Sequence, residues 1–350
     1  IQEITKIRTL WDKITMVYRT RHLGKFGLFS LKKVIGWHIK DPLLQKVLNI
    51  QCGDHGLSPA KASFPFHCAL MAHYLNGGFY PMGGGAAIVK SLTRHIKKNG
   101  GEIITGQAVK RVLVDLDAKG KASIATGVEM VNGDIIRAKH VISNADPGAT
   151  YKMVGHEYLD KKTVSKLLKT KYSVSSLMFF VTVDMDLQSL GLDSGNIWLI
   201  PDKDMDDVYD ELARMDILAM EELKSMFINF STLKDPVSYN GREHVIEIIT
   251  FIDYHAFRSK LEKSGNYEAA YRKCKDHLKV ILVKSLEKII PGITENILQV
   301  EIGTPTTNEY YVNSTQGCVY GTEKGFWQTG PFAFPNKTSI ENLDRKSTRL

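Results

Sequence analysis

The spacing of hydrophobic positions divides the chain into a helical beginning, a glycine-rich middle and a strand-rich second half. In residues 1–70, apolar side chains recur three and four positions apart, which predicts amphipathic helices. Lysine and arginine occupy several intervening positions of residues 6–19, so this helix either packs on the protein's own core or rests on anionic lipid. Asp41-Pro42 predicts the start of another helix, because aspartate caps helix N-termini and proline is accepted in the first turn.

A glycine-rich turn follows at residues 77–85, where five of nine residues are glycine. Glycine adopts positive φ without strain and lets a flat ligand approach the backbone closely, so this turn is a candidate binding element. The next stretch carries Ile88, Leu92 and Ile96 on one helical face. It ends at the Asn-Gly-Gly of residues 99–101, a combination that typically stops a helix.

After this helix, three short segments have the composition of β-strands: 102–105, 108–116 and 126–130. Asn132-Gly133 is a strong hairpin signal, because both residues tolerate the positive φ values of a tight turn. Residues 140–143 predict a short buried strand, which leads into an Asn-Ala-Asp loop.

The second half predicts a second sheet and a long helix. Alternating apolar and polar residues characterise four segments: 172–183, 196–200, 225–231 and 244–252. From Tyr267 to Ile290, apolar residues return to helical spacing, and Pro291-Gly292 predicts the end of that helix.

Composition narrows the class of protein only slightly. The chain is 43% hydrophobic over 350 residues, which suffices for a large core in two or so lobes. Lys and Arg exceed Asp and Glu by 46 to 38, and this excess favours anionic surfaces without selecting among lipid, nucleic acid and phosphorylated cofactors. Nucleic acid is the least favoured, because the basic residues belong to no recognisable binding module. No run of about 18 apolar residues occurs, so no membrane-spanning helix is predicted.

Cysteine spacing predicts free thiols in a reducing compartment, because no Cys-x-x-Cys pair occurs. The four cysteines lie far apart in the sequence: Cys52, Cys68, Cys274 and Cys318. Cys52 and His55, together with His67 and Cys68, suggest a metal cluster. Two Cys-His pairs in a helical stretch more often just pack, so we expect no metal.

The order of glycine turn, helix, Gly-Gly, strand, hairpin, strand and Asn-Ala-Asp resembles one known family. It is similar to the phytoene desaturase, carotenoid isomerase and retinol saturase group of FAD-dependent oxidoreductases. Further matching segments flank this stretch: 51–54, 58–59, 231–236, 303–311 and 317–321. The resemblance covers about residues 35 to 335.

The resemblance implies an α/β (α+β) fold with two domains. One is a discontinuous FAD-binding domain of the glutathione-reductase-like type, and the other is a substrate-binding domain of mixed sheet and helices. Residues 1–70 would be the helical part of the substrate domain, and 71–147 a segment of the FAD-binding domain. Residues 148–300 would form the substrate-binding domain proper, and 301–343 would return towards the FAD domain. Residues 344–350 match nothing in the family and are expected to be an unrelated tail.

The resemblance also implies which residues hold the cofactor. Gly83 and Gly84 would lie near the isoalloxazine ring, where a side chain would collide with the ring or the substrate. The backbone of Val109 matches the position that meets the adenine. Asn144, Ala145 and Asp146 match the loop that closes over the nucleotide half.

Substrate and catalytic residues are less well defined. Tyr80 and Met82 are candidates for lining a channel that holds a long polyene, although an aromatic and a methionine beside glycines are about as often plain packing. Glu309, Tyr310 and His55 are possible proton carriers, but each is more often a structural polar residue, so no catalytic residue is assigned.

One landmark of the family is missing from this sequence. No Gly-x-Gly-x-x-Gly follows a predicted strand, so the turn that holds the FAD pyrophosphate at a helix N-terminus is absent. We interpret the chain as an internal fragment without the N-terminal phosphate-binding βαβ unit. We therefore expect weak or no FAD binding by this chain alone.

Three hypotheses for function follow. The first is a desaturase, saturase or cis-trans isomerase that exchanges hydride between flavin and a polyene such as a carotenoid or retinoid, with membrane contact through the basic N-terminal helix. The second is an amine-oxidase-like flavoenzyme, and the third a cofactor-free fragment or lipid-binding relative. A long apolar cavity would favour the polyene, and a short polar pocket would favour the amine.

Overall fold

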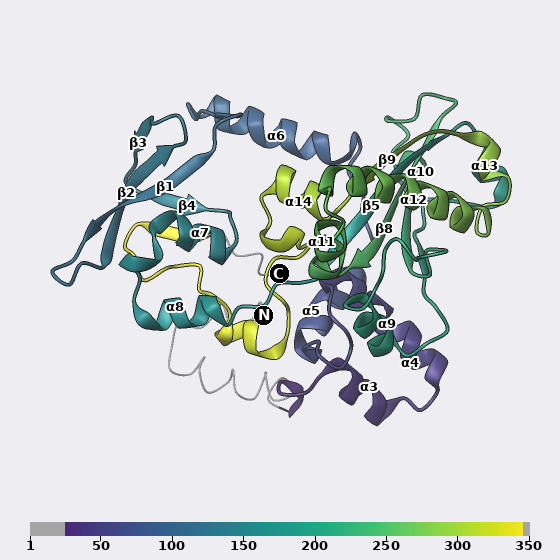
Figure 1. Cartoon of the computed structure of the whole chain (residues 1–350), viewed down its shortest axis with the longest axis horizontal. Helices are drawn as coiled ribbons and strands as arrows, with labels where there is room; N and C mark the ends of the chain where they lie inside the picture. Colours follow the sequence, from purple (N-terminus) through teal and green to yellow (C-terminus); the bar gives the residue numbers. More distant parts are fainter. Residues whose placement is uncertain (1–24, 346–350) are drawn as a thin grey trace.

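The computed structural model describes residues 25–345, which form two lobes with a long helix running between them (Figure 1). The larger lobe is built on a five-stranded sheet, and the smaller on a three-stranded and a two-stranded sheet. The basic helix predicted at residues 6–19 lies outside the described residues. Among the residues that are described, no helix is long and apolar enough to cross a membrane.

The sheet of the larger lobe has the strand order β6-β7-β8-β5-β9. Its strands are β5 (Ser175–Val183), β6 (Ile197–Leu199), β7 (Met226–Phe230), β8 (His244–Ile252) and β9 (Ile297–Gly303). The first four confirm the predicted segments, whereas β9 was not predicted. Every neighbouring pair is antiparallel, so the expectation of a mixed sheet is wrong. The reason is that β8 and β9 run in the same direction but β5 lies between them, antiparallel to both.

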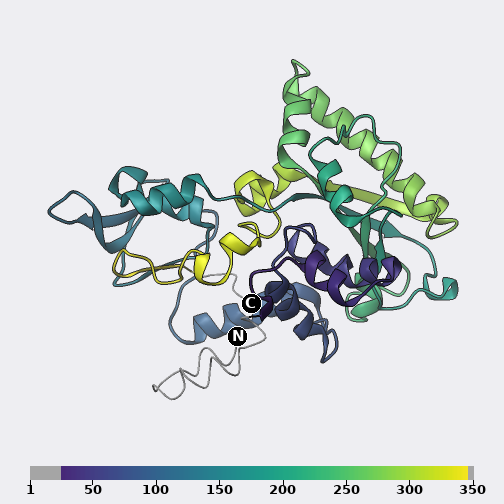
Figure 2. The same ribbon diagram turned by 90° about the horizontal axis from the view of Figure 1, so that it is seen from below.

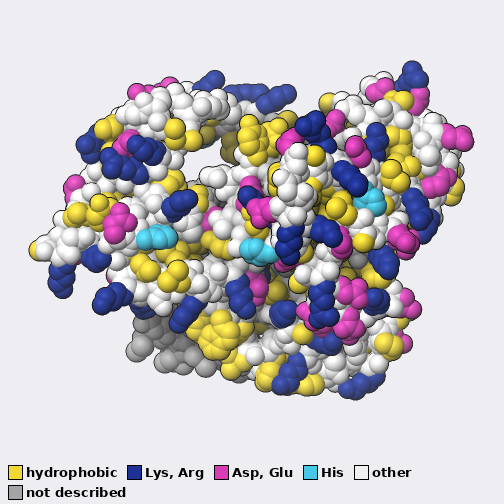
Figure 3. Space-filling model, in the orientation of Figure 1, with side chains coloured by type: hydrophobic (Ala, Val, Ile, Leu, Met, Phe, Trp, Pro, Cys, Tyr) yellow, Lys and Arg dark blue, Asp and Glu magenta, His cyan; other side chains and the backbone are white. Residues whose placement is uncertain are grey.

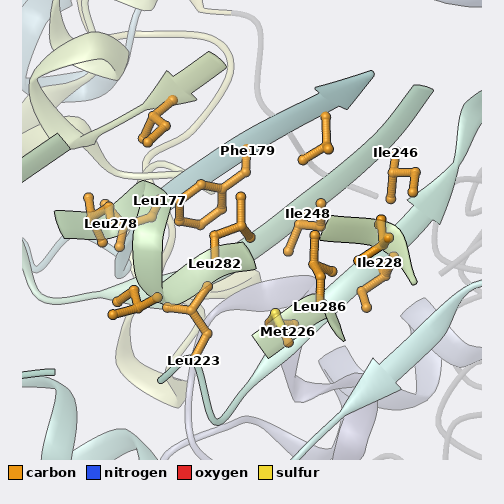
Figure 4. Packing of buried hydrophobic residues seen from close by; sticks show 14 of the residues in the cluster. Leu177, Phe179, Leu223, Met226, Ile228, Ile246, Ile248, Leu278, Leu282 and Leu286 are labelled. Atoms are coloured by element: carbon orange, nitrogen blue, oxygen red, sulfur yellow. The ribbon is translucent and has the colours of Figure 1, made fainter. Parts of the chain in front are cut away.

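The main core lies between this sheet and α12 (Tyr267–Glu287), the long helix that the sequence predicted. Alternate strand residues point towards α12, because successive side chains of a strand face opposite sides of the sheet. Figure 4 shows this packing with Phe179, Ile228 and Ile248 from three strands and with Leu278, Leu282 and Leu286 from the helix. All six side chains are fully buried.

Helices also cover the other face of the sheet, as Figure 2 shows from below. They include most of the N-terminal helical region that the sequence predicted: α3 (Leu31–His38), α4 (Pro42–Asn49), the 3₁₀ helix η2 (Ile50–His55) and α5 (Phe64–Tyr74). As predicted, Asp41 caps α4, accepting a hydrogen bond from the backbone N–H of Leu44 at 2.7 Å. The remaining helices of this lobe are α9 (Met205–Leu212), α10 (Ser231–Lys234), α11 (Tyr254–Glu262), α13 (Ile293–Asn296) and α14 (Pro305–Val312).

The smaller lobe combines an antiparallel hairpin sheet with a short parallel pair. Its elements are β1 (Val109–Leu116), β2 (Ala122–Met130), β3 (Ile135–Arg137), β4 (Val141–Ser143), α7 (Pro147–Val154), α8 (Lys161–Leu168) and β10 (Leu343–Arg345). The predicted Asn132-Gly133 turn joins β2 and β3, with Gly133 at φ +93°. A separate core holds this lobe together, with Val112, Tyr151 and Leu343 among its buried residues.

Three details of the smaller lobe differ from the expectations. Residues 102–105 form no strand, and Ile103 and Ile104 are 40% and 47% exposed, because no strand among the described residues lies beside them to pair with. The helices α7 and α8 pack into the core of this lobe rather than with the large sheet, although the sequence assigned residues from 148 onward to the other domain. Asp344 and Arg345, assigned to an unrelated tail, instead pair with Ile142 and Ser143 in the parallel ladder of β10 and β4.

Candidate functional site

The glycine turn lies at the start of α6 (Gly84–Lys98), the helix between the two lobes (Figure 1). Gly83 caps α6 with φ +81°, and Gly84 follows with φ +64°, a conformation that residues with a side chain rarely adopt. A Cβ would come no closer than 3.4 Å to another atom of this chain at Gly83 and 3.7 Å at Gly84. Within this chain, backbone conformation and not crowding therefore demands glycine at both positions.

A buried carboxylate ties the glycine turn to the large sheet. The backbone N–H of Gly83 donates to Oδ2 of Asp235 at 3.0 Å, and Asp235 is only 1% exposed. Asp235 ends α10, in the connection between β7 and β8. The sequence singled out both segments separately, but only the fold brings them into contact.

Asp146, predicted to lie over the nucleotide, makes three hydrogen bonds that join distant parts of the chain. Its carboxylate caps α7 by accepting from the backbone N–H of Ala149 at 3.1 Å. It also accepts from the hydroxyl groups of Tyr172 at 2.9 Å and Thr315 at 2.7 Å. Burial, together with the charge of Asp146, raises the pKa of Tyr172, so the phenol stays a donor. Asp146 therefore fixes the start of α7 to the segments that lead into and out of the large sheet.

The remaining predicted cofactor residues lie in the smaller lobe. Val109 begins β1 opposite Met130 and is 39% exposed. Asn144 and Ala145 form the loop between β4 and α7, and the carbonyl of Ala145 accepts a hydrogen bond from Thr150. The glycine turn and Val109 lie towards opposite ends of α6 (Figure 1). The predicted cofactor residues thus do not form one cluster: the glycine turn begins α6, and the others belong to β1 and the loop between β4 and α7.

A cavity of about 640 Å³ lies on the sheet face that points away from α12. A row of paired strand residues crosses this face, with Trp198 opposite Phe227 and Phe227 opposite Ile249. Both apolar and charged side chains line the cavity from α9 and the segment after it. The apolar ones include Met205, Val208, Leu212, Met215 and Met220, and the charged ones are Glu211, Arg214, Glu221, Glu222 and Lys224. The apolar side chains and the aromatic row suit the cavity to an apolar ligand, and the charged side chains add polar positions to its wall.

The segment from Gly53 to Gly56 packs tightly against the aromatic wall of the cavity. A Cβ on Gly53 would lie 2.5 Å from the Trp198 ring. At Gly56, where φ is +63°, a Cβ would lie 2.9 Å from both Tyr320 and Val174. These two glycines are needed because the backbone touches the side chains that shape the cavity.

Three polar groups of the cavity wall, on Asp54, Tyr209 and Tyr320, lie in buried surroundings. Burial raises the pKa of Asp54, and the hydrogen bond that its carboxylate accepts from the Tyr74 hydroxyl at 2.7 Å opposes that rise. The hydroxyl of Tyr209 is buried and has no hydrogen-bond partner among the described residues. Tyr320 completes the group, and burial raises the pKa of its phenol well above the usual range.

Other candidates from the sequence lie away from this cavity. Neither Tyr80 nor Met82 lines it, and they are 38% and 59% exposed. Glu309 forms an ion pair with Arg258 at 3.3 Å, and Tyr310 is 81% exposed. His55 is buried below the cavity-lining segment. The proposed proton carriers are therefore not gathered at one place.

The sequence did not identify the residues that line the cavity. Alternation in β7 and β8 predicted that each strand has two distinct faces, but both faces carry large apolar residues, such as Ile248 and Ile249. The nearest signal was Gly53, which stood in a segment matched to the family. The structure explains why glycine is needed there, because the Trp198 ring packs against its backbone.

The fold is similar to that of solved oxidoreductases. An oxidoreductase from Methanosarcina mazei superposes with a TM-score of 0.62 at 19% identity, over 95% of this chain and 66% of that one. A putrescine oxidase variant gives a TM-score of 0.55 at 12% identity, over 92% and 62%. At these identities the similarity concerns the fold alone.

Curated proteins give the more specific comparison. All-trans-retinol 13,14-reductase of Danio rerio is 28% identical over 337 residues, which are 92% of this chain and 54% of the relative. Phytoene desaturase of Neurospora crassa is 24% identical over 88% of this chain and 50% of the relative. Prolycopene isomerase of Daucus carota is 27% identical over 87% and 46%. These similarities confirm the family resemblance that the sequence motifs indicated.

Two further facts qualify the comparison. No family profile matches the chain. The chain spans about half the length of the curated relatives it matches.

Proposed function

We propose that this chain is part of an FAD-dependent oxidoreductase that acts on a long apolar polyene, such as a carotenoid or retinoid. The observation that carries the proposal is the apolar cavity on the large sheet, in a chain similar to a retinol reductase, a phytoene desaturase and a prolycopene isomerase. Desaturation, saturation and isomerisation all require one carbon-carbon bond to be placed against the flavin, so one cavity serves each. Bound FAD would supply hydride transfer, and the protein would supply orientation and exclusion of water.

The arrangement along α6 supports FAD as the cofactor. The backbone at Gly83 and Gly84, with its positive φ values, would approach the flavin ring, and Val109 would approach the adenine near the other end of the helix. Asn144, Ala145 and Asp146 would close over the nucleotide, with Asp146 acting mainly by positioning α7. An elongated cofactor fits this distribution better than a compact one.

Several exposed apolar side chains form surfaces that a further part of the cofactor domain would cover. Ile88, Leu92 and Ile96, the apolar face predicted for α6, are 52%, 60% and 40% exposed, and Ile142 of β4 is 71% exposed. The space-filling view shows an opening beneath α6 between the lobes (Figure 3). A phosphate-binding βαβ unit outside these 350 residues would cover these surfaces and would supply a strand beside residues 102–105.

Titration with FAD tests the consequence for this chain. Without a phosphate-binding turn we expect weak or undetectable binding, measured by the change of flavin fluorescence. Submicromolar retention of FAD would show that the turn is dispensable and that the remaining contacts form a complete cofactor site.

Ligand binding by the cavity separates the polyene from the amine hypothesis. All-trans-retinol is expected to quench the tryptophan fluorescence of the chain saturably, since Trp198 lines the cavity. Putrescine is expected to have the smaller effect, because its ammonium groups would lose water against the apolar parts of the wall, although four carboxylates also line the cavity: Asp54, Glu211, Glu221 and Glu222. Saturable binding of putrescine without binding of retinol would favour the amine-oxidase-like alternative. Binding of retinol without FAD would also fit the third alternative, a lipid-binding relative. Titration of a longer form that carries the βαβ unit with FAD separates the two, because only the flavoenzyme is expected to bind FAD.

Substitution of Gly53 tests whether the cavity is the binding site. In Gly53→Ala the new methyl group pushes Trp198 towards the cavity, so affinity for retinol is expected to fall about tenfold, as overpacking typically costs about 1–3 kcal/mol. Gly36→Ala is the matched control, because no atom lies within 4 Å of its Cβ position. Equal affinities of the two variants would place the ligand elsewhere.

Membrane contact is a further part of the proposal. Polyenes partition into lipid, so a protein that binds them would collect them at a membrane surface. The basic residues 6–19 would provide such contact with anionic lipid.

A further inference from the structure

Cys52, His55 and His67 converge in the interior, although the sequence led us to expect no metal there. Cys52 and His55 belong to η2, and His67 belongs to α5. Their exposures are 0%, 1% and 4%. One potential ligand atom from each residue lies within 4.8 Å of those of the other two. Cys68, the other cysteine of the segment, is exposed and does not take part.

The two imidazole rings face each other through nitrogen atoms. Nε2 of His55 lies 3.2 Å from Nδ1 of His67. The edge of a tetrahedron around zinc, with Zn–N bonds of about 2.0–2.1 Å, is about 3.3 Å long. The nitrogen pair therefore already has the separation that two ligands of one tetrahedral ion require.

The backbone orients one ring of the pair, and a polar atom of the other ring has no partner. His67 makes a hydrogen bond with the backbone of Leu48, and its Nδ1 faces Nε2 of His55. A backbone carbonyl that orients a histidine in this way is a frequent partner of metal-binding histidines. Nδ1 of His55, in contrast, is buried with no partner among the described residues. An ion bound through Nε2 would leave Nδ1 of His55 as it is, so the two nitrogen atoms that face each other, and not this one, favour an ion.

Charges around the cluster are compatible with a cation. Asp54 and Asp206 both act electrostatically on the Cys52 thiol, and Lys324 acts on His55 from another direction. Asp206 forms an ion pair with Lys32 at 2.9 Å, so two carboxylates and two ammonium groups surround the cluster and nearly balance. A divalent ion with one thiolate adds a single net positive charge to these nearly neutral surroundings.

We propose that Cys52, His55 and His67 bind one Zn²⁺ ion. Thiolate and imidazole are the ligands that zinc prefers, and three protein ligands leave one tetrahedral position for water. Binding releases the thiol proton of Cys52 to solvent, so charge and protons balance without a redox step. The ion joins η2 to α5 and thereby stiffens the segment that carries Gly53 and Asp54 into the cavity wall. This site is independent of the polyene and of FAD.

Metal analysis of the intact chain tests the site. After removal of adventitious metal with a chelator, Zn²⁺ is added, excess is dialysed away and bound zinc is measured by mass spectrometry. We expect about one zinc per chain in the wild type. Co²⁺ in place of zinc should give a thiolate-to-cobalt charge-transfer band and the intense visible bands of a tetrahedral ion.

Matched variants identify the ligands. Cys52→Ser and His67→Gln should each weaken zinc binding about 100-fold or more. Cys68→Ser and His73→Gln alter the neighbouring cysteine and another histidine of α5, and they should bind zinc like the wild type. Circular dichroism checks the fold of each variant. If the ligand variants fail to fold, the cobalt spectrum of the wild type decides alone.

Specific results would overturn the proposal. These are a wild-type chain that retains no zinc, a cobalt complex without a thiolate band, or equal zinc retention by Cys52→Ser and Cys68→Ser. The thermal midpoint gives a second readout, because zinc that binds only the folded chain should raise it in the wild type and not in Cys52→Ser.

Discussion

Replacement of Phe179 by alanine is expected to lower the free energy of unfolding by about 3–5 kcal/mol. Phe179 lies in β5, a strand with neighbours on both sides, and its ring is fully buried against the α12 side of the sheet (Figure 4). Removal of the ring loses its transfer free energy and leaves a cavity between sheet and helix that rigid neighbours cannot fill. Urea unfolding followed by circular dichroism measures the change.

Phe180 provides the matched control, because it is the same residue type at the next position of the same strand. Its side chain points to the other face of the sheet and is 40% exposed. Phe180→Ala is expected to cost less than about 1.5 kcal/mol. Similar losses of unfolding free energy in the two variants would mean that Phe179 does not face α12 and Phe180 the opposite side of the sheet.

Asp146→Ala is expected to lower the free energy of unfolding by about 3 kcal/mol. Each hydrogen bond to a charged group contributes about 1.5–3 kcal/mol, and water that bonds to the freed donors recovers part of the loss. The substitution leaves three donors without their acceptor, on Ala149, Tyr172 and Thr315. Because these donors come from separate parts of the fold, the loss should also loosen the smaller lobe. Urea unfolding gives the energy, and hydrogen exchange of α7 reports the loosening.

Asp160→Ala is the control for this prediction. Asp160 also caps a helix, α8, but it bonds only to Thr163 within its own first turn. Its replacement is expected to cost about 1 kcal/mol, the usual contribution of an N-cap. Asp146→Asn, which keeps one carbonyl acceptor, should lie between the two. If Asp146→Ala were no worse than Asp160→Ala, the contacts with Tyr172 and Thr315 would contribute nothing.

Much of the local structure followed from the sequence because it depends on neighbouring residues. The spacing of apolar residues predicted α6 and α12, and Asp41 and the Asn132-Gly133 turn predicted a helix start and a hairpin. Residues 102–105 show the limit of this reasoning. Their composition suits a strand, but a strand also needs a partner, which is absent from the part of the chain that the structure describes.

The candidate site depended more heavily on contacts between distant segments. The sequence singled out the glycine turn and the 231–236 segment, but it gave no sign that Asp235 binds the N–H of Gly83. Likewise, the spacing of Cys52 and His67 predicts no metal site, because linear spacing does not show whether η2 and α5 present their side chains to each other. Tyr80 and Met82 stand beside glycines in the sequence, but whether a residue lines this cavity depends on the packing of α9 against the sheet, and neither of the two does so.

The sequence by itself determined the types of most elements, the positions that require glycine and the family that the chain resembles. These properties reside in local conformational preference and in the linear order of motifs. Only the tertiary structure decided the antiparallel order of the large sheet, the face that carries the cavity, the partners of Asp146 and the meeting of two histidines with a cysteine. Such features arise where segments far apart in the chain are packed together, and no local pattern specifies which segments those are.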